Sequence, residues 1–180
     1  MDHESIAHQL GKNGRCIYPN FISPELAHDL REDLNQIRIS GEFKQGGVGQ
    51  GKDHSVRNQV RRDEIFWLNE GTVNPVQQLL WNQLALLKQA FNRTLYLGLT
   101  KFEGHYASYP NSGFYKRHLD CFQRDDARMV SIILYLNHNW KAADGGRLRI
   151  YENGSHVDID PIDGTLVCFL SRELEHEVLL

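Results

Sequence analysis

The chain has 180 residues, 41% of them hydrophobic and 24% charged, with a net charge of −3 and an isoelectric point of about 6.3. These values are ordinary for a soluble globular protein and exclude the overall basic charge of most nucleic-acid binders. No apolar run is long enough to span a bilayer, the start lacks signal-peptide features, and three scattered cysteines suit a reducing compartment. We therefore expect a cytoplasmic protein that binds neither nucleic acid nor membrane.

Two helices are predicted in the first half of the chain. Ser23-Pro24 places a capping hydroxyl before a proline at the first helical position, and an apolar stripe with helical spacing follows. A second helix is predicted from Asn74-Pro75 to about residue 95. The stripe of the first helix consists of Leu26, Leu30, Leu34 and Ile37.

A long loop rich in Gly, Lys and Gln is predicted between these helices, over residues 41–58. Its segment 46–53, GGVGQGKD, falls one residue short of the phosphate-loop pattern GxxxxGK[ST]. Asp53 stands where that loop needs a hydroxyl, and no hydrophobic strand precedes it. We therefore reject a nucleotide site here.

After about residue 100 the sequence consists of short β-rich runs separated by turn signals such as Asn153-Gly154 and Asp163-Gly164. Helices followed by many short strands predict an α+β protein whose strands form a sandwich or barrel. Without a linker, we expect one domain over residues 1–180, with helical support in about 1–100 and a barrel in about 101–180. The predicted strands lie within residues 101–110, 114–120, 128–137, 146–151, 155–160 and 164–170.

A candidate metal site begins with His118 and Asp120 in FYKRHLD. On a strand, residues two apart project from the same face, whereas in a loop both side chains would simply be hydrated. His176 follows the last apolar strand, and a barrel can bring its imidazole beside the pair. Two histidines and one carboxylate leave three adjacent metal positions open, an arrangement that suits Fe(II) oxygen chemistry.

The stretch from Tyr106 to Val178 carries SYPNSG, HLD, ILYLN, GGRLRIY and HEV in order. It resembles the 2-oxoglutarate- and Fe(II)-dependent prolyl hydroxylases, closest to the oxygen-sensing hypoxia-factor enzymes and their bacterial homologues. The segment from Arg61 to Trp67 also resembles the RxDxIxW segment of that family. The resemblance implies a double-stranded β-helix (a jelly-roll, cupin-like core) with supporting N-terminal helices. The implied iron ligands are His118, Asp120 and His176.

The resemblance also implies a 2-oxoglutarate pocket lined by Tyr109, Tyr135 and Leu148. Tyrosine hydroxyls can bond a carboxylate, and Leu148 matches an apolar residue of the family's pocket. The alternative is that Tyr135 and Leu148 are ordinary core residues, as most strand aromatics and leucines are.

Three charged residues match substrate-binding positions of the family. Arg128 matches a basic residue at the rim of the substrate groove. Arg61 and Asp63 match charged residues where a mobile loop closes on the substrate, and a solvated surface ion pair is the alternative for them.

The implied activity is hydroxylation of a prolyl residue in a protein substrate, with 2-oxoglutarate and O2 consumed and succinate and CO2 formed. No catalytic residue beyond the metal ligands is implied, ascorbate is a candidate reductant, and we expect a monomer. By analogy with bacterial members, a translation factor is a candidate substrate. The alternatives are a non-catalytic iron or 2-oxoglutarate sensor, an oxygenase of a small molecule or another residue, and a cupin-like zinc or manganese enzyme.

One feature departs from the family pattern. The family places a basic residue about nine positions beyond the distal histidine, where it pairs with the far carboxylate of 2-oxoglutarate. The chain stops at Leu180, four residues after His176. Because a strand ending in EVLL would leave a hydrophobic edge without a partner, we expect that C-terminal strands are missing.

Overall fold

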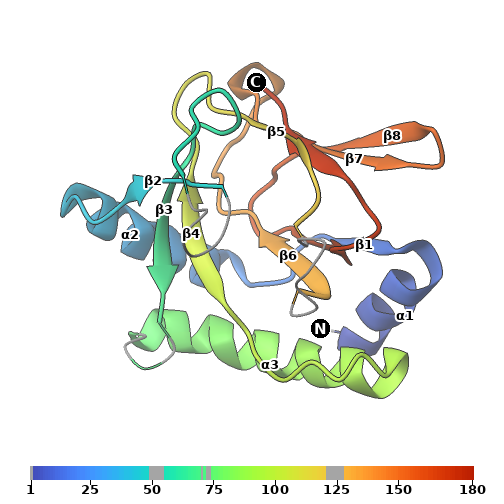
Figure 1. Cartoon of the computed structure of the whole chain (residues 1–180). Helices are drawn as coiled ribbons and strands as arrows, with labels where there is room; N and C mark the ends of the chain where they lie inside the picture. Colours follow the sequence, from blue (N-terminus) through green and yellow to red (C-terminus); the bar gives the residue numbers. More distant parts are fainter. Residues whose placement is uncertain (1, 49–54, 70, 72–73, 121–127) are drawn as a thin grey trace.

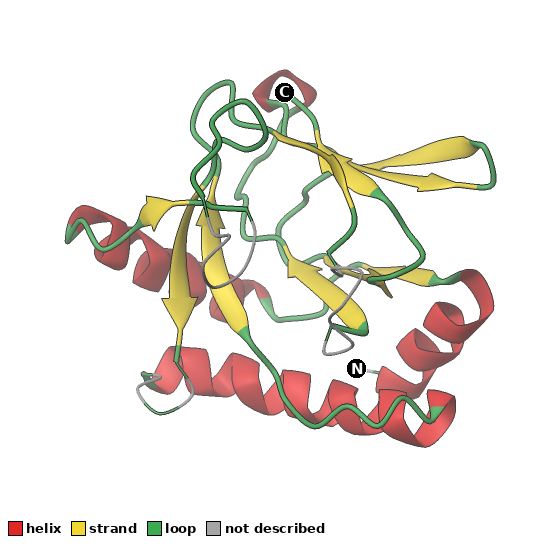
Figure 2. Ribbon diagram, in the orientation of Figure 1, coloured by secondary structure: helices red, strands yellow, loops and turns green. Residues whose placement is uncertain are grey.

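The structure is a computed structural model that describes residues 2–48, 55–69, 71, 74–120 and 128–180. Figure 1 shows helices beneath and beside a set of strands, and Figure 2 separates the two by colour. The α+β expectation is therefore confirmed. The elements are α1 (His3–Asn13), β1 (Arg15–Tyr18), α2 (Pro24–Ile39), β2 (Lys44–Gln45), β3 (Glu64–Leu68), α3 (Pro75–Leu95), β4 (Gly104–Ser108), β5 (Tyr115–His118), β6 (Val130–Leu134), a 3-10 turn (Ala142–Asp144), β7 (Leu148–Glu152), β8 (Ser155–Ile159), β9 (Leu166–Leu170) and β10 (His176–Val178).

Local capping chemistry fixes where the helices begin. The Ser23 hydroxyl accepts a hydrogen bond from the Leu26 backbone N–H at the start of α2, as predicted. The Asn74 side chain does the same for the Gln77 N–H at the start of α3, and a proline follows each cap. The sequence did not predict α1, whose first turn is capped by Asp2. Both predicted helices are thus confirmed.

The strands form three antiparallel sheets, ordered β1-β9-β6, β5-β10-β7-β8 and β2-β3-β4. Each predicted β-rich run matches one of the strands from β4 to β9, although β7 extends one residue beyond its run, to Glu152. The sequence did not predict β1 or β3 in the half of the chain that it assigned to helices. β1 pairs with β9 along its whole length, from Arg15 opposite Phe169 to Tyr18 opposite Leu166. The barrel sheet therefore includes a strand from the N-terminal segment.

Strand β9 separates the two hydrophobic clusters of the molecule because its side chains alternate between them. Leu166 and Cys168 pack with residues of α1, α2 and α3, whereas Val167 and Phe169 pack with residues of β7 and β8. These four side chains are fully buried, since neither face of β9 meets solvent. The second cluster also packs the sheet of β9 against the sheet of β10, and its member Phe169 contacts the site described below.

Two expectations need correction. The predicted loop 41–58 contains β2 and a bridge between Val48 and Ser55, while residues 49–54 lie outside the described part. The expected bare edge after His176 is also wrong, because β10 is hydrogen-bonded to β5 on one side and β7 on the other. No helix within the described residues is both long and apolar enough to cross a membrane.

Candidate metal centre

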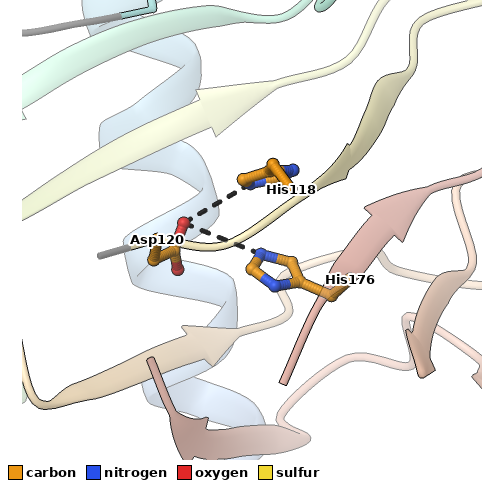
Figure 3. A group of neighbouring side chains, drawn as sticks. All are labelled: His118, Asp120 and His176. Atoms are coloured by element: carbon orange, nitrogen blue, oxygen red, sulfur yellow. Dashed lines mark ion pairs between the residues drawn. The ribbon is translucent and has the colours of Figure 1, made fainter. Parts of the chain in front are cut away.

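The side chains of His118, Asp120 and His176 come together, and their ligand atoms lie within 4.8 Å of one another (Figure 3). The Asp120 Oδ1 atom lies 3.4 Å from the His118 Nε2 atom and 3.7 Å from the His176 Nε2 atom. The histidines are direct cross-strand partners of β5 and β10. The expectation that Asp120 shares a strand face with His118 is wrong, because β5 ends at His118 and Asp120 lies just beyond it. The bend after the strand still turns the carboxylate toward both imidazoles.

Backbone contacts orient the two imidazoles. The Nδ1 atom of His118 is 2.7 Å from the Lys116 carbonyl oxygen, and the Nδ1 atom of His176 is 3.3 Å from the Leu174 carbonyl oxygen. A carbonyl can only accept, so each Nδ1 carries the proton and each Nε2 keeps a lone pair. Metal-binding histidines use this second hydrogen bond to fix tautomer and ring orientation. In their neutral forms, both rings therefore present an Nε2 lone pair beside the Asp120 carboxylate.

The surroundings of the centre keep the Asp120 carboxylate ionised. Desolvation acts to raise the pKa of Asp120, but a hydrogen bond with His118, the charge of His176 and a hydrogen bond from Ser131 outweigh it and hold this pKa well below its usual range. Desolvation lowers the pKa of His176, and the opposing effect of Asp120 is smaller. The Asp120 carboxylate therefore stays ionised beside the two imidazoles, and one carboxylate with two histidines is a donor set typical of non-haem iron centres.

Tyr115 is a site residue that the sequence did not identify. Its ring stacks on the His118 ring, with centroids 3.6 Å apart and planes 16° apart. Residues three apart should face opposite sides of a strand, but the pairing shifts here: His118 lies opposite His176, whereas Tyr115 lies opposite Val178. The resulting β-bulge brings both rings to one side.

The predicted pair of Arg61 and Asp63 lies behind Tyr115. The Arg61 guanidinium stacks over the Tyr115 ring at 4.4 Å and donates two hydrogen bonds to the Asp63 carboxylate. Asp63 is fully buried and the Arg61 side chain is only 11% exposed. The alternative of a solvated surface ion pair is therefore wrong. The pair instead supports the ring that covers His118.

The three residues predicted for 2-oxoglutarate lie around the second hydrophobic cluster or beside the ion pair. Leu148 is a buried member of that cluster, and Tyr135 packs against it. Tyr109 is 36% exposed, yet its pKa is raised, first by desolvation and then by the charge of Asp63, against a smaller opposing effect of Arg61. Desolvation also raises the pKa of Tyr135. Both phenols therefore stay protonated and able to donate hydrogen bonds.

Arg128 lies away from the three ligands, in an ion pair with Glu103 across 2.7 Å at the surface. Residues 121–127, which precede it, lie outside the described part of the chain. Phe169, which the sequence did not single out, packs its ring 4.5 Å from the His176 ring. Ser131 and Ser171 were also missed, although the Ser131 hydroxyl donates to the second oxygen of Asp120. Both serines stand in or next to an apolar run of the sequence, and a single serine in such a run does not indicate a functional site.

Comparison with known proteins accounts for this arrangement. Residues 104–180 match the family model of the 2OG-Fe(II) oxygenase superfamily. Human Egl nine homolog 1 is 30% identical over 97% of this chain, and mouse prolyl hydroxylase EGLN3 is 30% identical over 99% of it. The chain covers 80% of EGLN3 but only 42% of Egl nine homolog 1, so it spans less than half of the latter.

Solved structures agree with these relatives. A Pseudomonas putida prolyl-4-hydroxylase superposes with a TM-score of 0.89 at 35% identity, covering 99% of this chain and 91% of that one. A Trichoplax adhaerens prolyl hydroxylase, in complex with a peptide fragment of the hypoxia inducible factor, superposes with a TM-score of 0.84 at 29% identity, covering 98% and 84%. These likenesses confirm the expected jelly-roll core. The chain belongs to the 2OG-Fe(II) oxygenase superfamily and, within it, to the prolyl hydroxylase family.

Proposed function

We propose that the protein is an Fe(II)- and 2-oxoglutarate-dependent dioxygenase that hydroxylates a prolyl residue of a protein substrate. The observation that carries this proposal is the convergence of two imidazole Nε2 atoms on one carboxylate oxygen, at 3.4 and 3.7 Å, in a chain of the prolyl hydroxylase family. A structural ion pair alone would not need both imidazoles oriented by backbone carbonyls with their lone pairs facing the same oxygen.

The three side chains fit an iron ion as ligands. Their ligand atoms all lie within 4.8 Å of one another, and the pKa of Asp120 is held well below its usual range, so its carboxylate is ionised. When bound, Fe(II) with 2-oxoglutarate and O2 supplies the oxidation of a C–H bond, with succinate and CO2 as the other products. His118, Asp120 and His176 hold the ion. The rings of Tyr115 and Phe169 pack against the imidazoles of His118 and His176, respectively.

Tyr109, Tyr135 and Leu148 are proposed to hold 2-oxoglutarate. The raised pKa values keep both phenols as hydrogen-bond donors, and a carboxylate accepts such bonds. Leu148 packs in the cluster that Tyr135 contacts, so the two can line one wall beside the aliphatic part of the cosubstrate. Tyr135→Phe should therefore raise the KM for 2-oxoglutarate. An unchanged KM would mean that the Tyr135 hydroxyl does not bind the cosubstrate.

A protein substrate is proposed from the relatives and the charged residues near the centre. The Trichoplax enzyme was solved in complex with a peptide fragment, which supports a protein substrate for a fold this similar. We assign Arg61, Asp63 and Arg128 to the substrate side of the site, with the buried ion pair supporting the segment before β3 and the exposed Arg128 at the rim. A prolyl residue of a translation factor is the candidate target carried over from bacterial members of the family.

The remaining expectations are proposals of the same kind. We propose one domain over residues 1–180, a cytoplasmic monomer, ascorbate as reductant, and no nucleic-acid or membrane partner. The net charge of −3 and the buried, unpaired thiols of Cys16 and Cys168 support a reducing compartment and a surface unsuited to nucleic acid.

The experiment combines the protein, Fe(II), 2-oxoglutarate and ascorbate with a library of proline-containing peptides under air. We expect succinate and a 16 Da mass gain on a proline, both lost in Asp120→Ala. A mass gain that appears only on a free metabolite would refute the protein substrate. Metal and 2-oxoglutarate binding without succinate formation would favour the non-catalytic sensor instead.

A further inference from the structure

The two oxygens of Asp120 have different surroundings. Oδ1 faces the Nε2 atoms of both histidines, at 3.4 and 3.7 Å. Oδ2 points away from them and accepts a hydrogen bond of 2.5 Å from the Ser131 hydroxyl. A terminal carboxylate torsion has a broad, roughly two-fold energy profile, so the carboxylate needs such a contact to keep one oxygen at the centre.

A second hydroxyl lies behind the first. The oxygens of Ser131 and Ser171 are 2.8 Å apart. An ionised carboxylate can only accept hydrogen bonds, so the single hydroxyl proton of Ser131 is used on Asp120. The bond between the serines must then be donated by Ser171. The direction of the whole chain follows: Ser171 donates to Ser131, and Ser131 donates to Asp120.

Backbone pairing in the sheet opposite the histidines holds both serines. Ser131 lies in β6 and Ser171 directly follows β9, and the Ser171 N–H donates to the Met129 carbonyl at 3.0 Å. Ser131 shares its strand face with Ile133, which packs on the second hydrophobic cluster, and Ser171 is fully buried. Burying a hydroxyl costs free energy unless it is hydrogen-bonded, so the fully buried Ser171 needs a partner, and the half-buried Ser131 supplies it.

We propose that Ser171 and Ser131 form a hydroxyl relay of positioning residues, which holds Asp120 as a one-oxygen metal ligand. Neither serine would be a ligand; the relay keeps Oδ2 engaged, so that Oδ1 would be the oxygen that binds a metal. It also connects the sheet of β6 and β9, through hydrogen bonds, to Asp120 in the bend after β5. Because hydrogen bonds in a chain polarise one another, Ser171 strengthens the bond that Ser131 gives. The inference rests on the metal site of the proposed function.

The test measures metal binding without turnover. Co(II), whose ligand-field absorption reports coordination, is titrated into the purified whole chain. Loss of an outer partner of a metal ligand typically costs 10–100-fold in affinity, and we expect Ser131→Ala to weaken Co(II) binding by about that factor and to change the absorption spectrum. Ser131→Thr keeps the hydroxyl and should retain both the affinity and the spectrum.

Ser171 supplies the decisive comparison. Ser171→Ala should weaken Co(II) binding by a smaller factor, and the double alanine variant should bind no more weakly than Ser131→Ala alone, because the relay runs only through Ser131. The relay would be overturned if Ser171→Ala weakened Co(II) binding by the same factor in the wild type and in the Ser131→Ala variant. It would also be overturned if Ser131→Ala kept the wild-type affinity and spectrum. If Ser131→Ala does not fold, wild-type affinity in a folded Ser171→Ala variant overturns it. Failure of the wild type itself to bind Co(II) would refute the metal site of the proposed function instead.

Discussion

The ion pair of Arg61 and Asp63 predicts an unusually large loss of stability when one partner is removed. Asp63 is fully buried, and the Arg61 Nε donates to its Oδ1 atom at 2.6 Å while a second N–H bonds the other oxygen. Asp63→Ala removes both bonds. The guanidinium then stays under the protein surface with the Gly47 carbonyl, at 3.0 Å, and the face of Tyr115.

The magnitude follows from this geometry. Removing one partner of a buried ion pair costs about 3–5 kcal/mol, because the other charge is left without compensation. Arg61 keeps its bond to Gly47 and is 11% exposed, so we expect the lower end, about 3 kcal/mol. For a chain of this length each kcal/mol lowers the melting temperature by roughly 2–4 °C, which gives a drop of roughly 6–12 °C.

Urea unfolding of the variants measures this loss. The matched control is Asp158→Ala, because Asp158 lies at an exposed position on β8 and accepts two hydrogen bonds, of 2.6 and 2.7 Å, from Arg149 on β7. It should cost clearly less than Asp63→Ala. The double variant Arg61→Met/Asp63→Leu should recover most of the loss, since it leaves no buried charge. A loss below about 1 kcal/mol in Asp63→Ala, the range of exposed pairs, would refute the reasoning.

Three further predictions use other residues. Asp120→Ala should abolish succinate formation. It should also abolish the rise in melting temperature, roughly 5–11 °C, that a metal at 100 times its Kd gives the wild type in calorimetry. A retained rise would mean that the metal binds elsewhere. Gly46→Ala should lower the free energy of unfolding in urea by about 1–3 kcal/mol, because its new Cβ would lie 2.6 Å from two atoms of the buried ion pair. Unchanged stability would mean that the side chains of the pair can move to make room for the methyl group. Tyr106→Phe should cost roughly 1.5–3 kcal/mol, since it removes a 2.8 Å hydrogen bond to the Asp33 carboxylate between β4 and α2, whereas an unchanged urea midpoint would mean that Asp33 finds another donor.

Local signals in the sequence predicted the elements whose causes are local. The cap and proline pairs at Ser23 and Asn74 set the starts of α2 and α3, where the structure has them. Most of the later strands were predicted because β-branched runs alternate with turn residues. β1 was missed, since its four residues, RCIY, are too few to show a period. Its strand identity comes from pairing with β9, a contact about 150 residues away along the chain.

The candidate site divides in the same way. His118, Asp120 and His176 were predictable because a carboxylate and two imidazoles at family spacing carry chemical information on their own. Tyr115 was not, since the alternation of a regular strand assigns it to the opposite face and only the bulge reverses that assignment. The charged character of Arg61 was visible, but its burial depends on a neighbour, the Tyr115 ring, that the sequence did not place.

The metal centre is a property of two sheets rather than of one strand pair. The ligands belong to β5, the bend after it and β10, whereas the groups that steady them, Phe169 and the two serines, come from β9 and β6 on the opposite sheet. Val167 and Phe169 fix the separation of these sheets by packing with β7 and β8, and the opposite face of β9 is anchored on the helices. A substitution in the helical core that shifts β9 therefore reaches Asp120 and His176 without touching either, because packed interiors transmit displacement instead of absorbing it.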